Sequence, residues 1–219
     1  MNPRSASERV VRLYDRIGPL TDSTTFYVDA ALNRLTELAS LAEAKRIVEV
    51  GAGTGRYAER LLRTILPPNA QYIDLDPSRR MRELARGRLV PWSSRVRIRS
   101  LEDPLPGQWN GTVDRYVATY VLNVLPNGAA IRERLEHAHH VLADDGLLCL
   151  VNQTFGQRGF ERLISTLWML VYGARPAVLG NCRMLDAQQY LDGAAWRVRS
   201  REVVRRFGFC SEVLVAAKR

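Results

Sequence analysis

Residues 45–55 read KRIVEVGAGTG, which is a short apolar run followed at once by three glycines in five positions. An apolar run of this length is typical of a strand buried on both faces of a parallel sheet. Glycines after such a strand let the chain turn sharply and let a ligand approach the backbone closely. Apolar residues at helical spacing over 57–65 then predict a helix whose first amides are free for an anionic group. The stretch therefore predicts a ligand-binding turn in an α/β fold.

The same alternation of strand and helix continues along the chain. Strands are predicted at 45–50, 70–76, 96–100, 113–119 and 147–152, and helices at 7–41 (broken near Gly18-Pro19), 57–65, 77–88 and 127–142. Such alternation produces βαβ units and a parallel sheet. Two last strands, 196–204 and 212–217, are separated by a link too short for a crossover helix, which suits an antiparallel pair. We therefore predict an α/β fold with a doubly wound, mostly parallel seven-stranded sheet and an antiparallel C-terminal strand pair.

Length and composition favour one domain. The chain has 219 residues, 46% hydrophobic and 25% charged, which is an ordinary globular balance. Within it we expect an N-terminal helical cap segment (1–41), a ligand-binding core (42–153), a lid or insert (154–194) and the closing strand pair (195–219). No apolar run is long enough for a membrane span, and the first residues lack the apolar core of a secretory signal, which predicts a cytoplasmic protein.

Neither the cysteines nor the histidines predict a disulfide or a metal centre. The three cysteines, Cys149, Cys182 and Cys210, are odd in number and have no C-x-x-C spacing. The histidines at 137, 139 and 140 crowd onto one predicted helix, and no further ligands converge on them. We interpret them as part of a helix surface and expect no bound metal.

The formal net charge of +9 suggests a nucleic-acid or anionic-membrane partner. However, only two of the 32 basic residues are lysines, and two sets of arginines recur with a period of two. These sets, at 95, 97 and 99 and at 197, 199 and 201, would each lie on one side of a strand. Charges on strands protect exposed sheet edges from further pairing. We therefore expect edge strands at both places and disfavour nucleic acid as a partner.

Details of the glycine loop narrow the ligand. A dinucleotide loop reads G-x-G-x-x-G, whereas the sixth position here is Arg56, and the Gly-Lys-Ser/Thr ending of a phosphate loop is absent. Glu49, two residues before Gly51, would repel a pyrophosphate but suits a ligand with a positive charge. Asp76 or Asp74 ends the next strand, where a carboxylate can accept hydrogen bonds from ribose hydroxyls. A nucleoside with a cationic centre and no polyphosphate describes S-adenosyl-L-methionine.

The stretch 47–55 resembles motif I of the class I S-adenosylmethionine-dependent methyltransferases. The resemblance continues in order through 76–86 (DPSRRMRELAR), 100–106 (SLEDPLP), 113–125 and 140–146 (HVLADDG). Within the class, the chain is most similar to the ubiquinone/menaquinone-biosynthesis type of small-molecule methyltransferases, which often begin with a segment such as Tyr14-Asp15-Arg16. The resemblance implies a Rossmann-like methyltransferase fold, S-adenosyl-L-methionine as cofactor and a small-molecule acceptor.

The resemblance also assigns roles around the cofactor. Glu49 and the glycine loop would hold the methionine moiety, and Asp76 would hold the ribose. Ser100 and Leu101 would flank the adenine, although family members often carry Asp where Ser100 stands, and Thr119 would line the cofactor. The implied cofactor-binding residues are Glu49, Gly51, Ala52, Gly53, Gly55, Asp76, Ser100, Leu101 and Thr119.

The sequence identifies no catalytic base. Methyl transfer is an in-line displacement, for which the protein mainly supplies alignment and exclusion of water. The paired histidines that family members often show are replaced here by Asn123-Val124. Tyr14, Tyr27, Tyr120 and Asn123 lie on segments expected near the mouth of the site, and they are the substrate candidates.

The stretch 160–172 predicts a helix with apolar residues around most of its circumference. It could form a lid over an apolar acceptor such as a quinone, a lipid or a hydrophobic natural product, although packing on the sheet is slightly favoured for most of its residues. Its charges are not segregated as in an interfacial membrane helix. We predict methylation of a small, hydrophobic acceptor; the alternatives are an RNA or protein methyltransferase that uses the basic surface and a non-catalytic cofactor-binding subunit.

Overall fold

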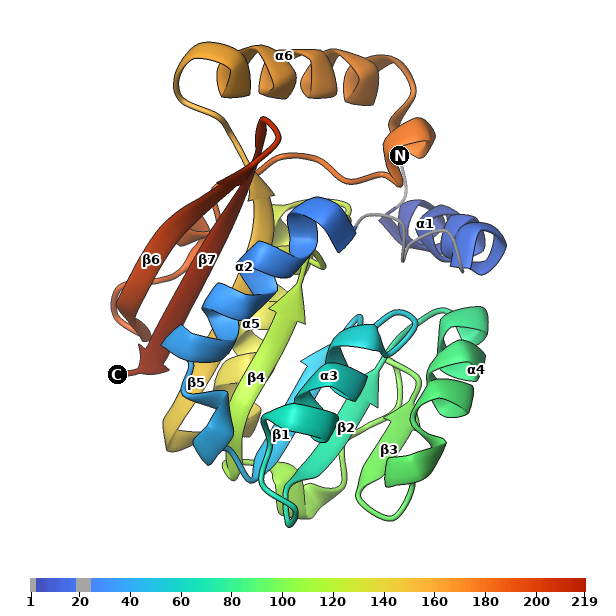
Figure 1. The fold of residues 1–219 in the computed structure, drawn as a ribbon, viewed down its shortest axis with the longest axis vertical. Helices are drawn as coiled ribbons and strands as arrows, with labels where there is room; N and C mark the ends of the chain where they lie inside the picture. The colour runs from blue at the N-terminus through green and yellow to red at the C-terminus, as the bar shows by residue number, and fades with distance from the viewer. Residues whose placement is uncertain (1–2, 19–24) are drawn as a thin grey trace.

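A computed structural model describes residues 3–18 and 25–219, and its seven strands form one sheet in the order β3-β2-β1-β4-β5-β7-β6 (Figure 1). The strands are β1 (Arg46–Val50), β2 (Gln71–Leu75), β3 (Val96–Arg99), β4 (Val113–Thr119), β5 (Leu142–Thr154), β6 (Trp196–Arg206) and β7 (Phe209–Lys218). Strands β1 to β5 pair in parallel, whereas β7 is antiparallel to both of its neighbours. The predicted fold class is confirmed.

Helices cover both faces of the sheet, as a doubly wound fold requires. They are α1 (Pro3–Ile17), α2 (Thr25–Leu38), α3 (Arg56–Thr64), α4 (Arg79–Arg88), α5 (Gly128–Val141) and α6 (Gly159–Ala174). Helices α2 and α3 lie on one face, where Leu35 and Leu61 join a buried cluster with Tyr72, and α5 lies on the other, where Ile131 packs with Leu148 (Figure 1). The helix predicted over 7–41 is two helices, and Pro19 of its expected break lies outside the described residues.

Strand β5 is longer than the predicted 147–152. It begins directly after α5, and its first residues pair with the start of β4 through an irregularity between Val113 and Arg115. The C-terminal hairpin is also tighter than predicted, because only Phe207 and Gly208 connect β6 to β7. Both residues have positive φ angles, 51° and 83°, which is the backbone twist that two-residue hairpin turns favour.

Both arginine-rich strands lie at the edges of the sheet, as predicted, because β3 and β6 end the strand order. The prediction that each set shares one side is wrong for β6. Its register shifts between Val198 and Ser200, and a bulge of one residue reverses the alternation of sides that follows it. Arg201 therefore reaches Glu212 (2.5 Å), while its neighbour Glu202 reaches Arg34 of α2 (2.7 Å) on the other face.

Helix α6 does not pack on a face of the sheet, which corrects the interpretation that the sequence slightly favoured. It lies across one end of the molecule, beyond the tip of the β6–β7 hairpin (Figure 1). Of its residues only Ser165 is buried, and its outward side chains are exposed. Within the ranges 3–18 and 25–219, no helix is long and apolar enough to cross a membrane.

Candidate active site

The three glycines after β1 are each required for a different physical reason. Gly51 and Gly55 have φ angles of +67° and +74°, and a Cβ at Gly51 would lie 2.4 Å from Val121 Cγ2, while one at Gly55 would lie 3.2 Å from Ala85 Cβ. Gly53 also has a positive φ, +59°, but a Cβ there would have no atom within 4 Å. The loop is therefore closely packed at both ends, and at its centre the backbone faces open space, where a ligand can approach it.

Asp76 directly follows β2 and ties the glycine loop to the start of α4. Its Oδ2 accepts a hydrogen bond from the Gly53 amide (3.0 Å), and its Oδ1 accepts one from the Ser78 amide (2.8 Å). The side chain is 5% exposed, and burial raises its pKa to about 6. Of the two acids considered for the ribose, Asp76 is the one that lies beside the loop, whereas Asp74 is an internal residue of β2.

Glu49 and Asp74 form a buried pair of carboxyl groups below the loop. They are register partners on β1 and β2, and each is 1% exposed or less. Tyr72 donates a hydrogen bond to Glu49 Oε2 (2.7 Å), but Glu49 Oε1 and both Asp74 oxygens have no hydrogen-bond partner among the described residues. Burial raises the pKa of Glu49 to about 7 and the pKa of Asp74 well above its usual value. Unpaired buried acids of this kind suit a cationic ligand.

The other predicted cofactor residues lie at the ends of adjacent strands. Thr119 is the last residue of β4, and Ser100 directly follows β3, with Leu101 packed against the core on the α5 side. The Ser100 amide donates to Asp103 Oδ2 (3.0 Å), so a carboxylate that sequence reasoning did not select stands beside the expected adenine position. The Asp103-Pro104 pair, a turn signal, is the only local feature that indicated it. Ala52 completes the loop, where its carbonyl accepts from the Gly55 amide (3.1 Å).

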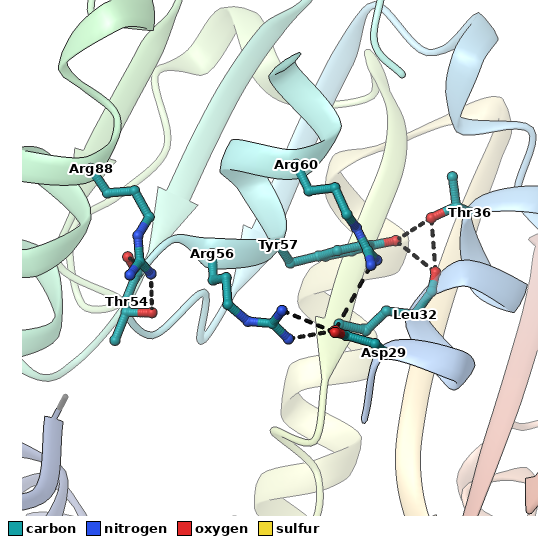
Figure 2. A network of polar contacts seen from close by, with 8 residues as sticks. All are labelled: Asp29, Leu32, Thr36, Thr54, Arg56, Tyr57, Arg60 and Arg88. Carbon is teal, nitrogen blue, oxygen red and sulfur yellow. Dashed lines mark hydrogen bonds and ion pairs between the residues drawn. The ribbon is translucent and has the colours of Figure 1, made fainter. Parts of the chain in front are cut away.

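Arginines on α3 and α4 fix the loop and the helices beside it (Figure 2). Arg88 donates to the Thr54 carbonyl (3.0 Å) and hydroxyl (2.5 Å), which anchors the loop to α4. Arg56 makes a two-pronged ion pair with Asp29 of α2 (2.5 and 3.2 Å), so α2 is held against the first turn of α3. These contacts join segments far apart in sequence, and no local pattern indicated them.

Helix α1 docks beside Asp76. Ser78 caps the N-terminus of α4 by accepting from the Met81 amide (3.1 Å), and its hydroxyl donates to Asp15 Oδ1 (2.5 Å). The Arg80 amide also donates to Asp15 Oδ1 (3.2 Å). The segment 14–16, which sequence reasoning singled out only through a resemblance, is thus placed at the start of α4.

Aromatic side chains from α2, α6 and β7 gather near this end of the sheet. Tyr27 stacks on Phe209 (centroids 4.8 Å apart), and Trp168 meets Phe209 edge-on (5.9 Å). The Trp168 indole donates to the Cys182 carbonyl (2.8 Å). Tyr14 of α1 approaches the same loop, since a Cβ built at Gly180 would lie 3.4 Å from the Tyr14 hydroxyl. We call Tyr14, Tyr27, Trp168 and Phe209 the aromatic cluster.

Tyr120 adjoins this cluster, whereas the side-chain amide of Asn123 is occupied by hydrogen bonds to the backbone. The Tyr120 hydroxyl lies 2.8 Å from Ser211 Oγ on β7, and its φ of +60° is rare for a bulky side chain, a feature that concentrates at functional sites. Asn123 is fully buried: its amide nitrogen donates to the Gln153 and Arg183 carbonyls (2.8 and 2.6 Å), and its oxygen accepts from the Gln153 amide (3.0 Å). Both of its amide protons are therefore used by the backbone, which corrects its selection as a substrate candidate.

Titratable groups near the aromatic cluster are held neutral. Burial raises the pKa of the Tyr14, Tyr27 and Tyr120 hydroxyls above the usual value, and it raises the pKa of the Cys182 thiol to about 12. The histidines of α5 lie elsewhere, with His137 bonded to Tyr116 (3.1 Å). In the described part of the chain, no group of three His, Cys, Asp or Glu side chains is arranged to hold a metal ion.

The doubly wound seven-stranded sheet, with an antiparallel last strand and a glycine loop between two acids, has the Rossmann-like fold of methyltransferases. Residues 48–148 match a family model described as a methyltransferase domain. The match covers the glycine loop and the acids at 49, 74 and 76, so this part of the chain is similar to a methyltransferase domain.

Solved structures share this fold over most of the chain. The [4+2]-cyclase SpnF is 17% identical with a TM-score of 0.70, covering 95% of this chain and 94% of its own. A possible histamine N-methyltransferase from Thermotoga maritima is 18% identical with a TM-score of 0.63, covering 96% and 100%. The pyocyanin biosynthetic protein PhzM is 18% identical with a TM-score of 0.63, covering 86% of this chain and 54% of its own. Among curated proteins, no sequence matches this chain.

Proposed function

We propose that this chain is an S-adenosylmethionine-dependent methyltransferase and that it acts on a small, hydrophobic acceptor that contains a ring system. The observation that carries the proposal is the aromatic cluster, in which the Tyr27–Phe209 stack and the edge-on Trp168 come from three separate elements. Aromatic surfaces of this kind bind flat apolar molecules through area burial and stacking. The neutral tyrosine hydroxyls beside them offer hydrogen bonds without a charge that an apolar acceptor would have to desolvate.

The proposed cofactor residues would bind different parts of the cofactor, some through charge and others through shape. Glu49, with its unpaired Oε1, would face the cationic methionine portion, and Asp76 would accept hydrogen bonds from the ribose. Gly53 would let the cofactor contact the backbone, while Ser100, Leu101 and Thr119 would enclose the adenosine at the neighbouring strand ends. When bound, the cofactor supplies an electrophilic methyl group on a sulfonium.

The protein contributes to methyl transfer by aligning the reactants and excluding water rather than by removing a proton. The phenols of the aromatic cluster and the Cys182 thiol all have raised pKa values, so they are protonated at neutral pH and are not bases. An acceptor in this position must bring its own nucleophilic atom, which attacks the methyl carbon in line as the bond from carbon to sulfur breaks. Tyr120, Tyr27 and Tyr14 would orient that acceptor.

Residues 154–194, with α6, form the part of the chain that we assign as the lid or insert, and residues 1–41 form the cap. Trp168 of α6 reaches the aromatic cluster from the insert, and Tyr14 and Tyr27 reach it from the cap. An acceptor such as a quinone, as in the ubiquinone/menaquinone-biosynthesis type, or another hydrophobic ring compound fits this enclosure. PhzM and SpnF, which share the fold, agree with a small-molecule role. A cytoplasmic location is part of the proposal.

The alternative, an RNA or protein acceptor bound by the basic surface, has less support because several arginines are committed to structure. Arg95 donates to the Pro67 and Leu62 carbonyls (2.7 and 3.0 Å), and Arg115 donates to the Ala39 carbonyl (2.5 Å). Others line the two edge strands. A positive net charge that is spread over such roles does not form a continuous nucleic-acid footprint.

The test uses purified protein, methyl-labelled S-adenosylmethionine and an extract of the source cells. The reaction is divided into organic-extractable, water-soluble, RNA and protein fractions, and a Tyr27→Ala variant serves as the acceptor-site control. We expect label in the organic fraction with the parent and a several-fold lower yield with Tyr27→Ala at unchanged cofactor affinity. Label confined to RNA or protein would reject the small-molecule proposal.

A further inference from the structure

Helix α6 turns a continuous apolar stripe away from the rest of the molecule. Phe160, Leu163, Leu167, Leu170 and Val171 recur at spacings of three and four residues and are 63%, 54%, 48%, 64% and 40% exposed. That spacing places them on one side of a helix. The opposite side packs inward, where Trp168 meets Phe209 and Ser165 is buried. The outward side of α6 therefore has no charged residue along its centre. Phe160 borders Gly208 at the hairpin tip, and the rest of the stripe is exposed among the described residues.

The charges around this stripe are almost all positive. Arg158 directly precedes α6, Arg162 lies on its flank and Arg175 directly follows it; all three are exposed, and none forms an ion pair within 3–18 or 25–219. Glu161 is the single acidic residue between 155 and 180, and it is paired with Arg205 of β6 (3.1 Å). The charges thus lie at the flank and ends of the helix, which corrects the sequence interpretation that they are not segregated.

A hollow adjoins the stripe at the start of α6. It has a volume of about 680 Å³ and is lined by Arg158, Phe160, Glu161, Arg205 and Gly208, with Gln157 and Gly159. The first residues of α6 line it, and the positive end of a helix favours anions. Arg205 is paired with Glu161 in this lining, so the hollow combines the Phe160 ring with the guanidinium of Arg158, which suits an anionic group attached to an apolar chain.

We propose that α6 docks this protein on an anionic lipid bilayer, with the apolar stripe in the acyl–headgroup boundary and the arginines on the lipid phosphates. An interfacial helix has this combination of an uncharged apolar face and flanking basic residues. Anionic lipid attracts each arginine near the surface, and the long arginine stems bury their methylenes while the charge stays at the headgroups. The proposal is independent of the acceptor's identity.

A second copy of the chain fits this face less well than lipid does. In a two-fold dimer the same patch meets itself, so the basic ends of one stripe would oppose those of the other. The chain as a whole also carries a net charge of +9, which adds repulsion between copies. An anionic bilayer complements both the apolar stripe and its positive rim.

The test measures cosedimentation of the full chain with vesicles of phosphatidylcholine with or without phosphatidylglycerol. We expect binding only when phosphatidylglycerol is present, and weakening as salt is raised. The double variant L167E/L170E should lower the partition coefficient by about tenfold or more, because it places charge in the acyl boundary. Both positions are exposed, so circular dichroism should stay unchanged.

Two matched controls distinguish binding through this face from nonspecific adsorption to the vesicles. Val90 is 63% exposed and lies beside β3, at the opposite edge of the sheet. The Val90→Glu variant should therefore bind the vesicles as the parent does. Neutralising Arg158, Arg162 and Arg175 to Gln should abolish the preference for phosphatidylglycerol, whereas Arg97→Gln on β3 should not. Absence of parent binding, or equal loss with Val90→Glu, would overturn the proposal. Sedimentation velocity tests the other occupant. A dimer that forms without lipid and is abolished by L167E/L170E would assign the face to a second copy of the chain and would also overturn the proposal.

Discussion

Glu49 on β1 and Asp74 on β2 are register partners with buried carboxyl groups, and among the described residues only Glu49 accepts a hydrogen bond, from the Tyr72 hydroxyl. Like charges this close in a dry interior cannot both be ionised at low cost. The pair is therefore expected to retain a proton when no cationic ligand is bound. In the proposed function, the positive charge of this ligand is the sulfonium of the cofactor.

The first prediction concerns stability and pH without cofactor. The pKa of Glu49 is raised from 4.5 to about 7, so the native state binds the proton more tightly than the unfolded state does. The stability from this group is present below pH 4.5 and is lost as pH rises through about 7. We expect Glu49→Gln to reduce that loss by roughly 3 kcal/mol, measured by urea unfolding from pH 4 to 8.

Exposed Glu43→Gln is the matched control for this measurement, and it should leave the slope unchanged. A slope that survives Glu49→Gln would place the proton on Asp74, and Asp74→Asn would then have to remove it. A slope that survives both changes would contradict the shared-proton interpretation.

Asp76→Ala should weaken cofactor binding. The change removes the acceptor for ribose hydroxyls and also the bonds from Gly53 and Ser78 that fix the loop. The loss of charged hydrogen bonds costs about 1–3 kcal/mol, or roughly 5- to 150-fold in affinity. Titration calorimetry measures it, with the exposed Asp145→Ala as control. Unchanged affinity would exclude Asp76 from the ribose site.

Gly53→Ala separates cofactor contact from backbone strain. Gly53 and Gly111 have similar positive φ angles, +59° and +65°, and a Cβ at either position would have no atom within 4 Å. Each alanine should therefore destabilise the fold by a similar amount, about 1 kcal/mol. Only Gly53→Ala should also lower cofactor affinity, because its methyl group would stand where the ligand approaches. Equal affinities in calorimetry would show that the ligand does not contact this part of the loop.

Asn123→Ala should act on stability rather than on the acceptor. The change removes the acceptor of the buried Gln153 amide and a donor to the Arg183 carbonyl, whereas the Gln153 carbonyl keeps the Leu185 amide as a donor, so the cost is roughly 1–3 kcal/mol. Urea unfolding measures the loss, and it should be accompanied by an unchanged KM for the acceptor. Tyr27→Ala is the contrasting variant, since it should raise KM with a smaller stability change. A raised KM in Asn123→Ala at low temperature, where the variant is folded, would return Asn123 to the acceptor site.

Much of the cofactor side follows from the sequence alone. The apolar run 45–50, the glycine loop and the acid at 76 are local signals, because a strand, a turn and the residue that ends the next strand are each set within a few positions. The alternation of strands and helices then leaves few topologies, since parallel crossovers are right-handed and connections are short. For this reason the order of elements, the edge strands and the place of Asp76 were predictable.

Only the tertiary structure decided the rest. The aromatic cluster joins Tyr27, Trp168 and Phe209 across more than 180 residues of chain, and no periodic pattern encodes contacts between segments that far apart. The bulge before Ser200 reversed the side of Arg201, and the exposure of α6 depended on what failed to pack against it. Hydrophobic patterning determines that a face is apolar, but whether that face is covered depends on the three-dimensional arrangement of every other element.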